Sequence, residues 1–346
     1  MKVLGRSSDA APAPSVPNGP VAPPPAPSPP GRGARRRPWR RVVALLVVLV
    51  LLLPVGMFAF GWWQFSRIPT VDVSSALRPQ AGRSGTNYLI VGTDSRAGIA
   101  ADDPNAGAFL DEGISGSRTD TIMVLRIEGG SASLLSIPRD LWVTDPATGQ
   151  KGRINSTFAA GPANLVNAVT ALGIPIQHYM EINFVSFSRL VDAIGGITVE
   201  VPAPARDGNS GLQIDAAGPV TLDGAQALAF VRSRYYEQFV DGVWQADPTG
   251  DIGRTERQRV FLTTLLRGVA DTRNPLVLAR IPGAVGGGMR IDDDLTYFDA
   301  LRLGWTLRGV SPAATTIPVT PRTTTGGAAV LELGPGASEV FASFSR

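Results

Sequence analysis

The chain of 346 residues contains no cysteine and only one histidine, His178. Without cysteine, disulfide bonds, thiol nucleophiles and cysteine-containing metal sites are excluded, so the fold depends on an ordinary apolar core. A Ser-His-Asp triad would have to use His178, but no GxSxG motif accompanies it, and we expect a structural role for this residue. Phosphate-binding loops of the GxxxxGK type and dinucleotide-binding GxGxxG fingerprints are also absent.

Lysine is nearly absent as well, and positive charge is unevenly spread. Lys2 and Lys151 are the only lysines among 32 basic residues, so arginine is the default cation and its use at any one site carries little information. Residues 1–41 hold eight of the basic residues and one of the 29 acidic ones. The remaining chain therefore has 24 basic and 28 acidic residues, and any anion site in it must be local.

The first 63 residues contain a tail and a long uncharged segment. Residues 10–30 are almost entirely Ala, Pro, Ser, Val and Gly, so residues 1–41 are predicted to form a disordered Pro-rich and Arg-rich tail. The uncharged segment 42–63 is long enough to cross a bilayer. It ends in "GWWQF" rather than in the small residues of a cleavage site, which favours an uncleaved transmembrane helix over a signal peptide.

The arginines between 32 and 41 predict the orientation of this helix. By the positive-inside rule, residues 1–41 are cytoplasmic and the chain after residue 63 is extracytoplasmic, which predicts a single-pass protein of the cell membrane. The alternative for these arginines is a nucleic-acid-binding arm. Directly beside a membrane span this alternative is weaker, so we expect no nucleic-acid partner.

The remaining chain is predicted to form a stalk (64–86), one domain (87–322) and a short C-terminal tail (323–346). Strand patterns occur at 87–93, 121–128 and 132–138, and the "GG" between the last two is typical of a hairpin. Helical spacing occurs at 163–173, 222–231, 252–270 and 295–308. Strands and helices alternate, which predicts an α/β fold: a single three-layer domain with helices packed on a central mixed β-sheet.

Acidic residues lie at the ends of two predicted strands. Asp94 follows the first strand in "VGTDSR", and Arg118 and Asp120 precede the next in "SRTDTIMV". Two carboxylates at adjacent strand ends can share one Mg²⁺, which takes oxygen ligands and completes its shell with phosphates and water. Aspartate is equally suited to turns and helix caps, so both roles stay open at this point.

Arginines lie in three further motifs. Arg139 follows a strand in "SIPRD", and Arg232 and Arg234 in "FVRSR" share a face only if that segment is extended. Guanidinium groups bind phosphate oxygens through two parallel hydrogen bonds, so these motifs are candidates for an anion site. The predicted helix "DIGRTERQR" brings three side chains together on one face: Arg254, Arg257 and Gln258.

Seven segments occur in the order "VGTDSR", "SRTDTIMVLRI", "SIPRD", "GRINSTFA", "HYMEINFVSFSRLVDAIGGITVEVP", "LDGAQALAFVRSR" and "GRTERQ". In this combination the chain resembles the LytR-CpsA-Psr family of cell-wall glycopolymer ligases over about residues 85–272. The resemblance implies a phosphotransferase that moves a glycopolymer from a polyprenyl-pyrophosphate carrier to the C6 hydroxyl of muramic acid in peptidoglycan. The Arg-heavy, Ala-rich composition suits an actinobacterial source.

The resemblance also assigns roles by motif. Asp94 and Asp120 match the Mg²⁺ ligands and, with Arg118 and Arg139, the catalytic residues of the family. The lipid chain is expected in an apolar tunnel, for which the segments 163–173, 185–194 and 260–269 are candidates. The residues implied to hold the pyrophosphate are Arg118, Arg139, Arg232, Arg234, Arg254, Arg257 and Gln258.

Three alternatives use the same features differently. A polyprenyl-pyrophosphate pyrophosphatase would use water as the nucleophile in the same site, and a non-catalytic module would only bind lipid-linked glycan. A membrane-tethered regulator would bind DNA through residues 1–41. His178, the one histidine, is expected to be structural, so the proton acceptor for a hydroxyl would be Asp94 or Asp120.

Overall fold

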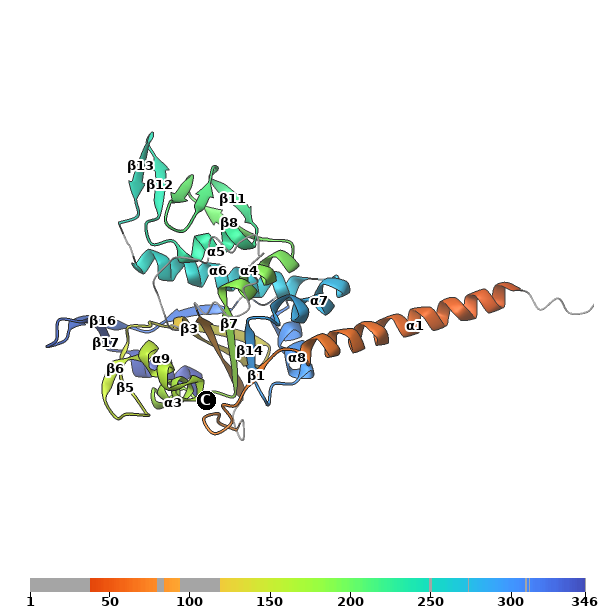
Figure 1. Cartoon of the computed structure of the whole chain (residues 1–346), viewed down its shortest axis with the longest axis horizontal. Coiled ribbons are helices and arrows are strands. Elements are labelled where there is room, and N and C mark those ends of the chain that lie inside the picture. Colours follow the sequence, from red (N-terminus) through yellow and green to blue (C-terminus); the bar gives the residue numbers. More distant parts are fainter. Residues whose placement is uncertain are drawn as a thin grey trace, which may run out of the picture. The chain divides into compact units, whose positions relative to one another are not determined.

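The computed structural model describes residues 38–79, 84–93, 119–248, 251–272, 274–308, 310 and 312–345. The chain divides into two units, Met1–Val50 and Leu51–Arg346. Within the described residues the second unit contains an α/β domain built on a seven-stranded mixed sheet, which confirms the predicted fold class (Figure 1). The strands lie in the order β1 (Thr70–Val71), β14 (Met289–Asp292), β7 (His178–Asn183), β2 (Gly85–Thr93), β3 (Thr119–Glu128), β4 (Ser131–Ile137) and β15 (Ala313–Thr316).

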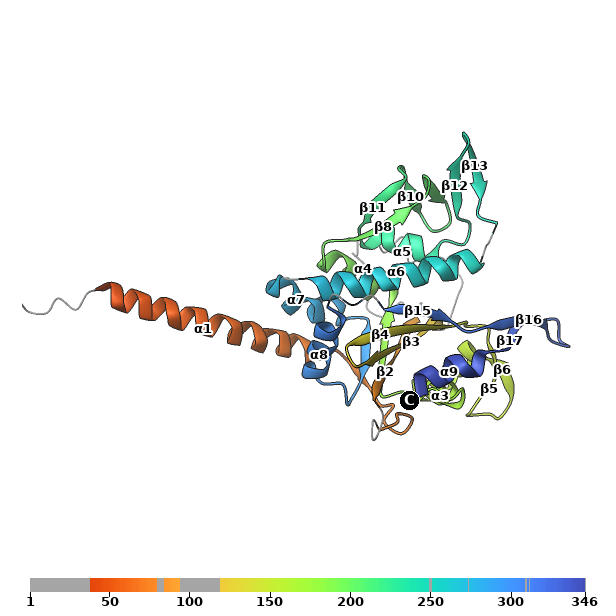
Figure 2. The same cartoon turned by 180° about the vertical axis from the view of Figure 1, so that it is seen from behind.

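The central strands are apolar on both faces because helices cover both faces of the sheet (Figures 1 and 2). Leu89 and Val91 of β2 face one side, where they pack with η1 (Ile154–Ala160), α3 (Pro162–Ala171) and α9 (Ala337–Ser345). Tyr88 and Ile90 face the other, as the period of two along a strand requires. That second face is covered by α6 (Asp251–Asp271), α7 (Pro275–Val285) and α8 (Tyr297–Leu307).

A second, smaller core lies between α4, α5 and α6 and a group of short antiparallel strands. Its helices are α4 (Phe184–Ala193) and α5 (Gly224–Arg232), together with α6 from Phe261 to Val269. Its strands are β8 (Ile197–Val201), β9 (Ala205–Asp207), β10 (Leu212–Ile214), β11 (Gly218–Leu222), β12 (Glu237–Val240) and β13 (Val243–Ala246). Two hairpins complete the fold: β5 (Trp142–Thr144) with β6 (Lys151–Arg153), and β16 (Val319–Thr323) with β17 (Ala329–Leu333).

The elements with long, strong patterns lie where the sequence predicted them. The hairpin β3–β4 is antiparallel, and Gly129 and Gly130 at its turn have positive φ angles that favour glycine. The predicted span 42–63 lies within α1 (Pro38–Phe65). Within the described ranges, α1 is the one helix long and apolar enough to cross a membrane.

Two predicted boundaries need correction. The predicted stalk contributes Val73 and Ala76 to the main core, and β1 pairs with β14, so residues 68–77 belong to the domain. The predicted C-terminal tail contains β17 and α9, which buries Phe341 and Phe344 in the same core. Both segments are too short for their periodicity to stand out in the sequence. Residues 1–37 of the predicted tail 1–41 lie outside the described residues.

Candidate active site

One edge of the central sheet gathers the strand ends that carry the predicted motifs. Thr93, the last residue of β2, pairs with Thr119 of β3 on one side and with Asn183 of β7 on the other. On the far side of β3, Ile122 pairs with Ile137, the last residue of β4. The ends of β2, β7 and β4 and the beginning of β3 therefore form one continuous edge, called the site edge below.

Of the predicted acidic residues, Asp94 follows the last residue of β2 in the sequence, and Asp120 belongs to β3. Asp94 and Arg118 lie outside the described residues. Asp120 is the second residue of β3, and its backbone lies at the site edge, but its side chain is not among those described. The hydroxyl of Thr93 is buried and has no hydrogen-bond partner among the described residues. The edge thus contains a buried oxygen directly before Asp94.

Arg139 leaves the sheet at the same edge, two residues after the end of β4. Its Nε lies 3.4 Å from Oδ2 of Asp140, and the other oxygen of Asp140 lies 3.2 Å from Nε of Arg153. The backbone is also held, because the Asn155 amide donates to the Arg139 carbonyl at 3.1 Å. Asp140 therefore lies between two arginines beside the strand end.

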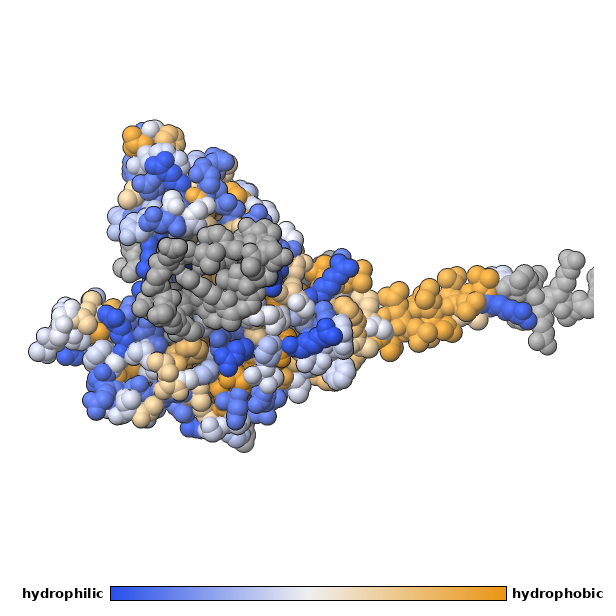
Figure 3. Space-filling model, viewed as in Figure 1, coloured by the Kyte–Doolittle hydropathy of each residue, from blue (hydrophilic) through white to orange (hydrophobic). Residues whose placement is uncertain are grey.

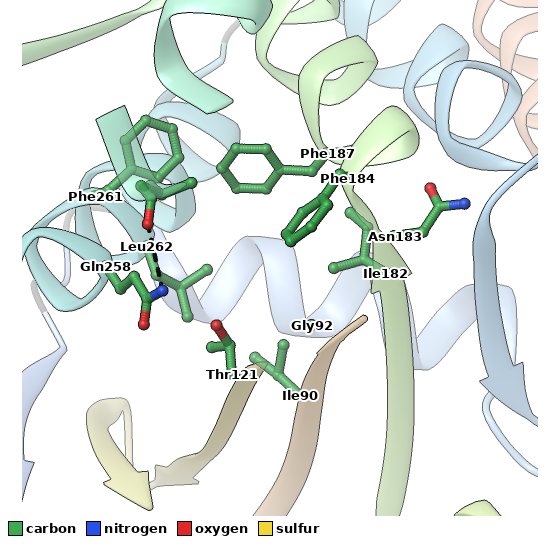
Figure 4. A pocket seen from close by; sticks show the side chains of 11 residues that line it. Ile90, Gly92, Thr121, Ile182, Asn183, Phe184, Phe187, Gln258, Phe261 and Leu262 are labelled. Atoms are coloured by element: carbon green, nitrogen blue, oxygen red, sulfur yellow. Dashed lines mark hydrogen bonds between the residues drawn. The ribbon is translucent and has the colours of Figure 1, made fainter. Parts of the chain in front are cut away.

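A mostly apolar pocket opens beside the site edge, between the sheet and helices α4 and α6 (Figure 4). Figure 4 shows the rings of Phe184, Phe187 and Phe261 on the helix side and Thr121 on the sheet side. Two of the three segments predicted for an apolar tunnel, 185–194 and 260–269, contribute residues to this pocket, and helix α3 (within 163–173) does not line it. Its full lining is Ile90, Gly92, Thr121, Ile182, Asn183, Phe184, Phe187, Val231, Gln258, Phe261 and Leu262.

The two arginines of "FVRSR" lie on different elements. Arg232 is the last residue of α5, and Ser233 ends the helix with an extended ψ of 120°. The segment is thus neither a strand nor a continuous helix, the two geometries that the sequence left open. The Arg232 guanidinium carbon lies 5.4 Å from the ring centroid of Phe184, a pocket residue, whereas the Arg234 side chain is exposed. Residues 232–236 are called the arginine turn below.

Asp207, at the end of β9, holds the arginine turn from one side. Its Oδ2 accepts hydrogen bonds from the Ser233 hydroxyl at 2.7 Å and from the amides of Arg234 and Tyr235 at 3.0 Å each. Burial raises the pKa of the Asp207 carboxyl, but the hydrogen bonds from Ser233, Tyr235 and the 209–210 amides outweigh burial, so the net pKa is lowered. Asp207 is therefore held as a carboxylate in the turn's interior.

Arg257 holds the same turn from the other side. Its Nη2 donates to the Ser233 carbonyl at 3.0 Å, its Nη1 donates to Asp247 Oδ2 at 2.8 Å, and its guanidinium lies 4.3 Å from the ring centroid of Tyr236. Only 9% of the residue is exposed. The guanidinium is engaged inside the protein, which differs from the predicted contact with pyrophosphate and indicates a positioning role.

Of the three residues predicted on one face of helix α6, Arg257 thus points into the protein rather than toward the pocket. Gln258 lines the pocket and donates from Nε2 to the Val231 carbonyl at 3.3 Å. Arg254 lies one turn earlier in α6, and its side chain is not among those described. Sequence analysis missed Asp207 and Asp247, because "ARDGNSG" and "WQADPTG" have the composition of ordinary turns.

We expect the stabilisation by Asp207 to depend on pH. Because its pKa is lowered in the folded state, the stabilisation is present above the ordinary value of about 3.9 and is lost as pH falls through the folded-state value. Asp207→Asn should lower the free energy of unfolding by about 2 kcal/mol at pH 7 and by much less near pH 3. Urea unfolding of both full chains in detergent micelles, followed by near-UV circular dichroism, measures this. An equal difference at the two pH values would contradict the expectation.

His178 lies at the start of β7, at the end of the sheet opposite to the site edge. Its ring stacks on Tyr88 with centroids 5.1 Å apart, and Nδ1 lies 3.4 Å from Asp292. Asp292 also accepts a hydrogen bond from the Tyr179 amide at 2.8 Å. The expected structural role of His178 is thus confirmed by its contacts.

Comparison with known proteins agrees with the motifs. The probable cell wall biosynthesis protein LcpB of Corynebacterium glutamicum is 36% identical over 255 residues, which cover 69% of this chain and 57% of that protein. The polyisoprenyl-teichoic acid–peptidoglycan teichoic acid transferase TagU of Enterococcus faecalis is 29% identical over 266 residues, covering 73% and 79% of the two chains. This chain therefore spans little more than half the length of the corynebacterial relative.

Solved structures give the same result. The LytR-Csp2A-Psr enzyme from Actinomyces oris superposes with a TM-score of 0.64 at 26% sequence identity, covering 81% of this chain and 96% of that one. Residues 67–333 match the LytR_cpsA_psr family, and this range begins within the predicted stalk and includes β17. Since the match covers well over half of the sequence, the chain belongs to the LytR_cpsA_psr family.

Proposed function

We propose that the protein is a phosphotransferase that moves a glycopolymer from a polyprenyl-pyrophosphate carrier to the muramic acid C6 hydroxyl of peptidoglycan. Family membership and the names of two relatives support this: one is a teichoic acid transferase acting on peptidoglycan and the other a probable cell wall biosynthesis protein. We also propose that α1 spans the cell membrane, with residues 1–41 cytoplasmic and the domain extracytoplasmic, because arginines precede the span.

The observation that carries the proposal is a cationic site next to an apolar pocket. Gly92, Thr121 and Asn183 near the site edge line the pocket together with Gln258 and Phe184, and Arg232 contacts the Phe184 ring. Arg139 follows the end of β4 at the same sheet edge. A polyprenyl pyrophosphate has this same combination of an anionic group and an apolar chain. The pocket suits the first isoprene units, and the arginines suit the pyrophosphate.

The donor groups at the site edge fit Mg²⁺, which takes oxygen ligands. Asp94 and Asp120 would hold the ion; Thr93, which precedes Asp94, pairs with Thr119, which precedes Asp120, and the buried Thr93 hydroxyl adds an oxygen without another described partner. When bound, the ion would neutralise negative charge on the pyrophosphate.

The transfer is a displacement at the phosphorus next to the sugar. The acceptor oxygen forms a bond to this phosphorus, the bond to the bridging oxygen breaks, and polyprenyl phosphate leaves with the bonding electrons. The hydroxyl proton passes to Asp94 or Asp120 as base. Arg118, Arg139, Arg232, Arg234 and Arg254 would bind and orient the phosphates, which is the main protein contribution in phosphoryl transfer.

The proposal is tested with the full chain in lipid nanodiscs, a short synthetic polyprenyl-pyrophosphate glycan, Mg²⁺ and peptidoglycan oligomers. Mass spectrometry should find polyprenyl phosphate and a muramic acid phosphodiester in equal amounts, and Asp94→Ala should abolish both. Phosphoglycan without phosphodiester would indicate the pyrophosphatase instead. Tightly bound but unreacted lipid would indicate a binding module.

A further inference from the structure

Helix α8 carries an exposed apolar stripe. Phe298, Leu301 and Trp305 are 67%, 42% and 73% exposed, and their spacing of three and four residues places them on one helix face. Another side of α8 packs Leu303 and Leu307 into the apolar cluster that contains Leu262 of α6. Large apolar side chains gathered on one exposed face mark an interaction surface. The three residues are called the α8 stripe below.

The first turn of α8 packs against the C-terminal turns of α1 (Figures 1 and 2). The ring of Phe58 lies 5.2 Å from that of Tyr297 and 5.5 Å from that of Phe298, centroid to centroid. A Cβ atom at Gly61 would collide with the Tyr297 hydroxyl, so a larger residue at this position would displace the Tyr297 side chain. The α8 stripe therefore begins at a residue in direct contact with α1.

The length of α1 places this contact at the membrane boundary. A hydrocarbon core of about 30 Å takes about 20 helical residues. Counted from Val42, the first residue after the arginines, that stretch ends near Gly61 and includes Phe58. Figure 3 shows the hydrophobic surface of this helix. Phe298 touches Phe58 and so lies at the depth where the hydrocarbon ends, with Trp305 two turns, or roughly 10 Å, further along α8.

A tryptophan ring with an arginine guanidinium beside it occurs near the C-terminal end of α1 and again near the C-terminal end of α8. The Arg67 guanidinium lies 3.5 Å from the ring centroid of Trp63, and the Arg308 guanidinium lies 5.4 Å from that of Trp305. Arg302, beside Leu301 in the chain, is exposed as well. Tryptophan at the boundary of the hydrocarbon with arginine toward the phosphates is typical of the membrane interface, and the arginines suit anionic headgroups.

We propose that the α8 stripe rests in the interface of the bilayer that α1 crosses, with Arg302 and Arg308 on anionic lipid headgroups. The proposal rests on the proposed membrane span and is argued from the continuity of the stripe with α1. Since α8 packs on α6, and α6 supplies Phe261 and Leu262 to the pocket, this contact holds the pocket close to the leaflet that contains the lipid substrate.

The absence of cysteine allows a direct test by single spin labels. The full chain carries Leu301→Cys or Trp305→Cys, is labelled, and is reconstituted in nanodiscs of phosphatidylcholine and phosphatidylglycerol. Leu49→Cys on α1 is the control for the span, and Val243→Cys, exposed on β13, is the control for water. Electron paramagnetic resonance compares the access of oxygen, which concentrates in lipid, with that of a polar nickel chelate.

At both α8 positions we expect an oxygen-to-nickel access ratio several-fold above that at Val243 and closer to that at Leu49. A ratio equal to that at Val243, with Leu49 in lipid, would overturn the α8 proposal and leave the span intact. Low access of both reagents would show a protein contact instead and would also overturn it. A water-accessible Leu49 would refute the span and the α8 proposal together.

Discussion

Replacing Arg257 by alanine is expected to lower the free energy of unfolding by about 3–5 kcal/mol and turnover by at least about 100-fold. The change removes an ion pair with Asp247 and the hydrogen bond to the Ser233 carbonyl, and both interactions lie in a largely buried part of the protein. Ser233 lies between Arg232 and Arg234, so its displacement moves both arginines. Urea unfolding and the rate of polyprenyl phosphate release measure the two effects.

The strands β9, β12 and β13 offer a matched control. Arg206 pairs with Glu237 at 2.6 Å and also lies over an aromatic ring, Trp244, but its side chain is 44% exposed. Exposed pairs contribute little, so Arg206→Ala should cost no more than about 1 kcal/mol and leave turnover unchanged. Arg257→Lys keeps the charge but not both hydrogen bonds, and should recover only part of the activity. If Arg257→Ala and Arg206→Ala had equal effects, Arg257 would have no positioning role.

Arg254→Ala is expected to lower kcat by about 10²–10³ while leaving the protein slightly more stable. Arg254 lies in the first turn of α6, where the helix dipole disfavours a cation by roughly 0.3–1 kcal/mol. That unfavourable placement has a functional explanation if the guanidinium stabilises the charge that develops on the leaving polyprenyl phosphate. Steady-state kinetics and urea unfolding of the full chain give the two values.

Arg267→Ala is the control for this second experiment. Arg267 lies in the same helix, is exposed and lies near the C-terminal end of α6, about 20 Å from Arg254. Its replacement should leave kcat unchanged. Loss of stability in Arg254→Ala together with unchanged kcat would show that Arg254 is a structural residue.

Much of the domain could be predicted because its central elements have long patterns. The strands β2, β3 and β4 each contain a recognisable apolar or β-branched stretch, and the predicted helix 252–270 differs from α6 by one residue at each end. The order of motifs along these elements also identified the family. In contrast, β17 and α9 have few residues each, and their burial depends on contacts with the core that no local pattern contains.

The side chains that hold the arginine turn, Asp207 and Arg257, could not be identified in that role from the sequence. Asp207 and Ser233 are 26 residues apart, and Arg257 reaches Asp247 and Ser233 from a third element. Helical spacing correctly placed Arg254, Arg257 and Gln258 within one helix, yet it does not show where each side chain ends. Arg257 turns inward because a carboxylate, a carbonyl and a ring surround its guanidinium.

The most direct measurement of the proposed transfer is the reaction in water enriched in ¹⁸O. If the acceptor hydroxyl attacks the phosphorus next to the sugar, neither the muramic acid phosphodiester nor the released polyprenyl phosphate takes up ¹⁸O, because no water oxygen enters either product. If water is the nucleophile, one ¹⁸O appears in the phosphoglycan. We predict an unlabelled phosphodiester formed in equal amount to polyprenyl phosphate, and labelled phosphoglycan as the main product would contradict the transferase.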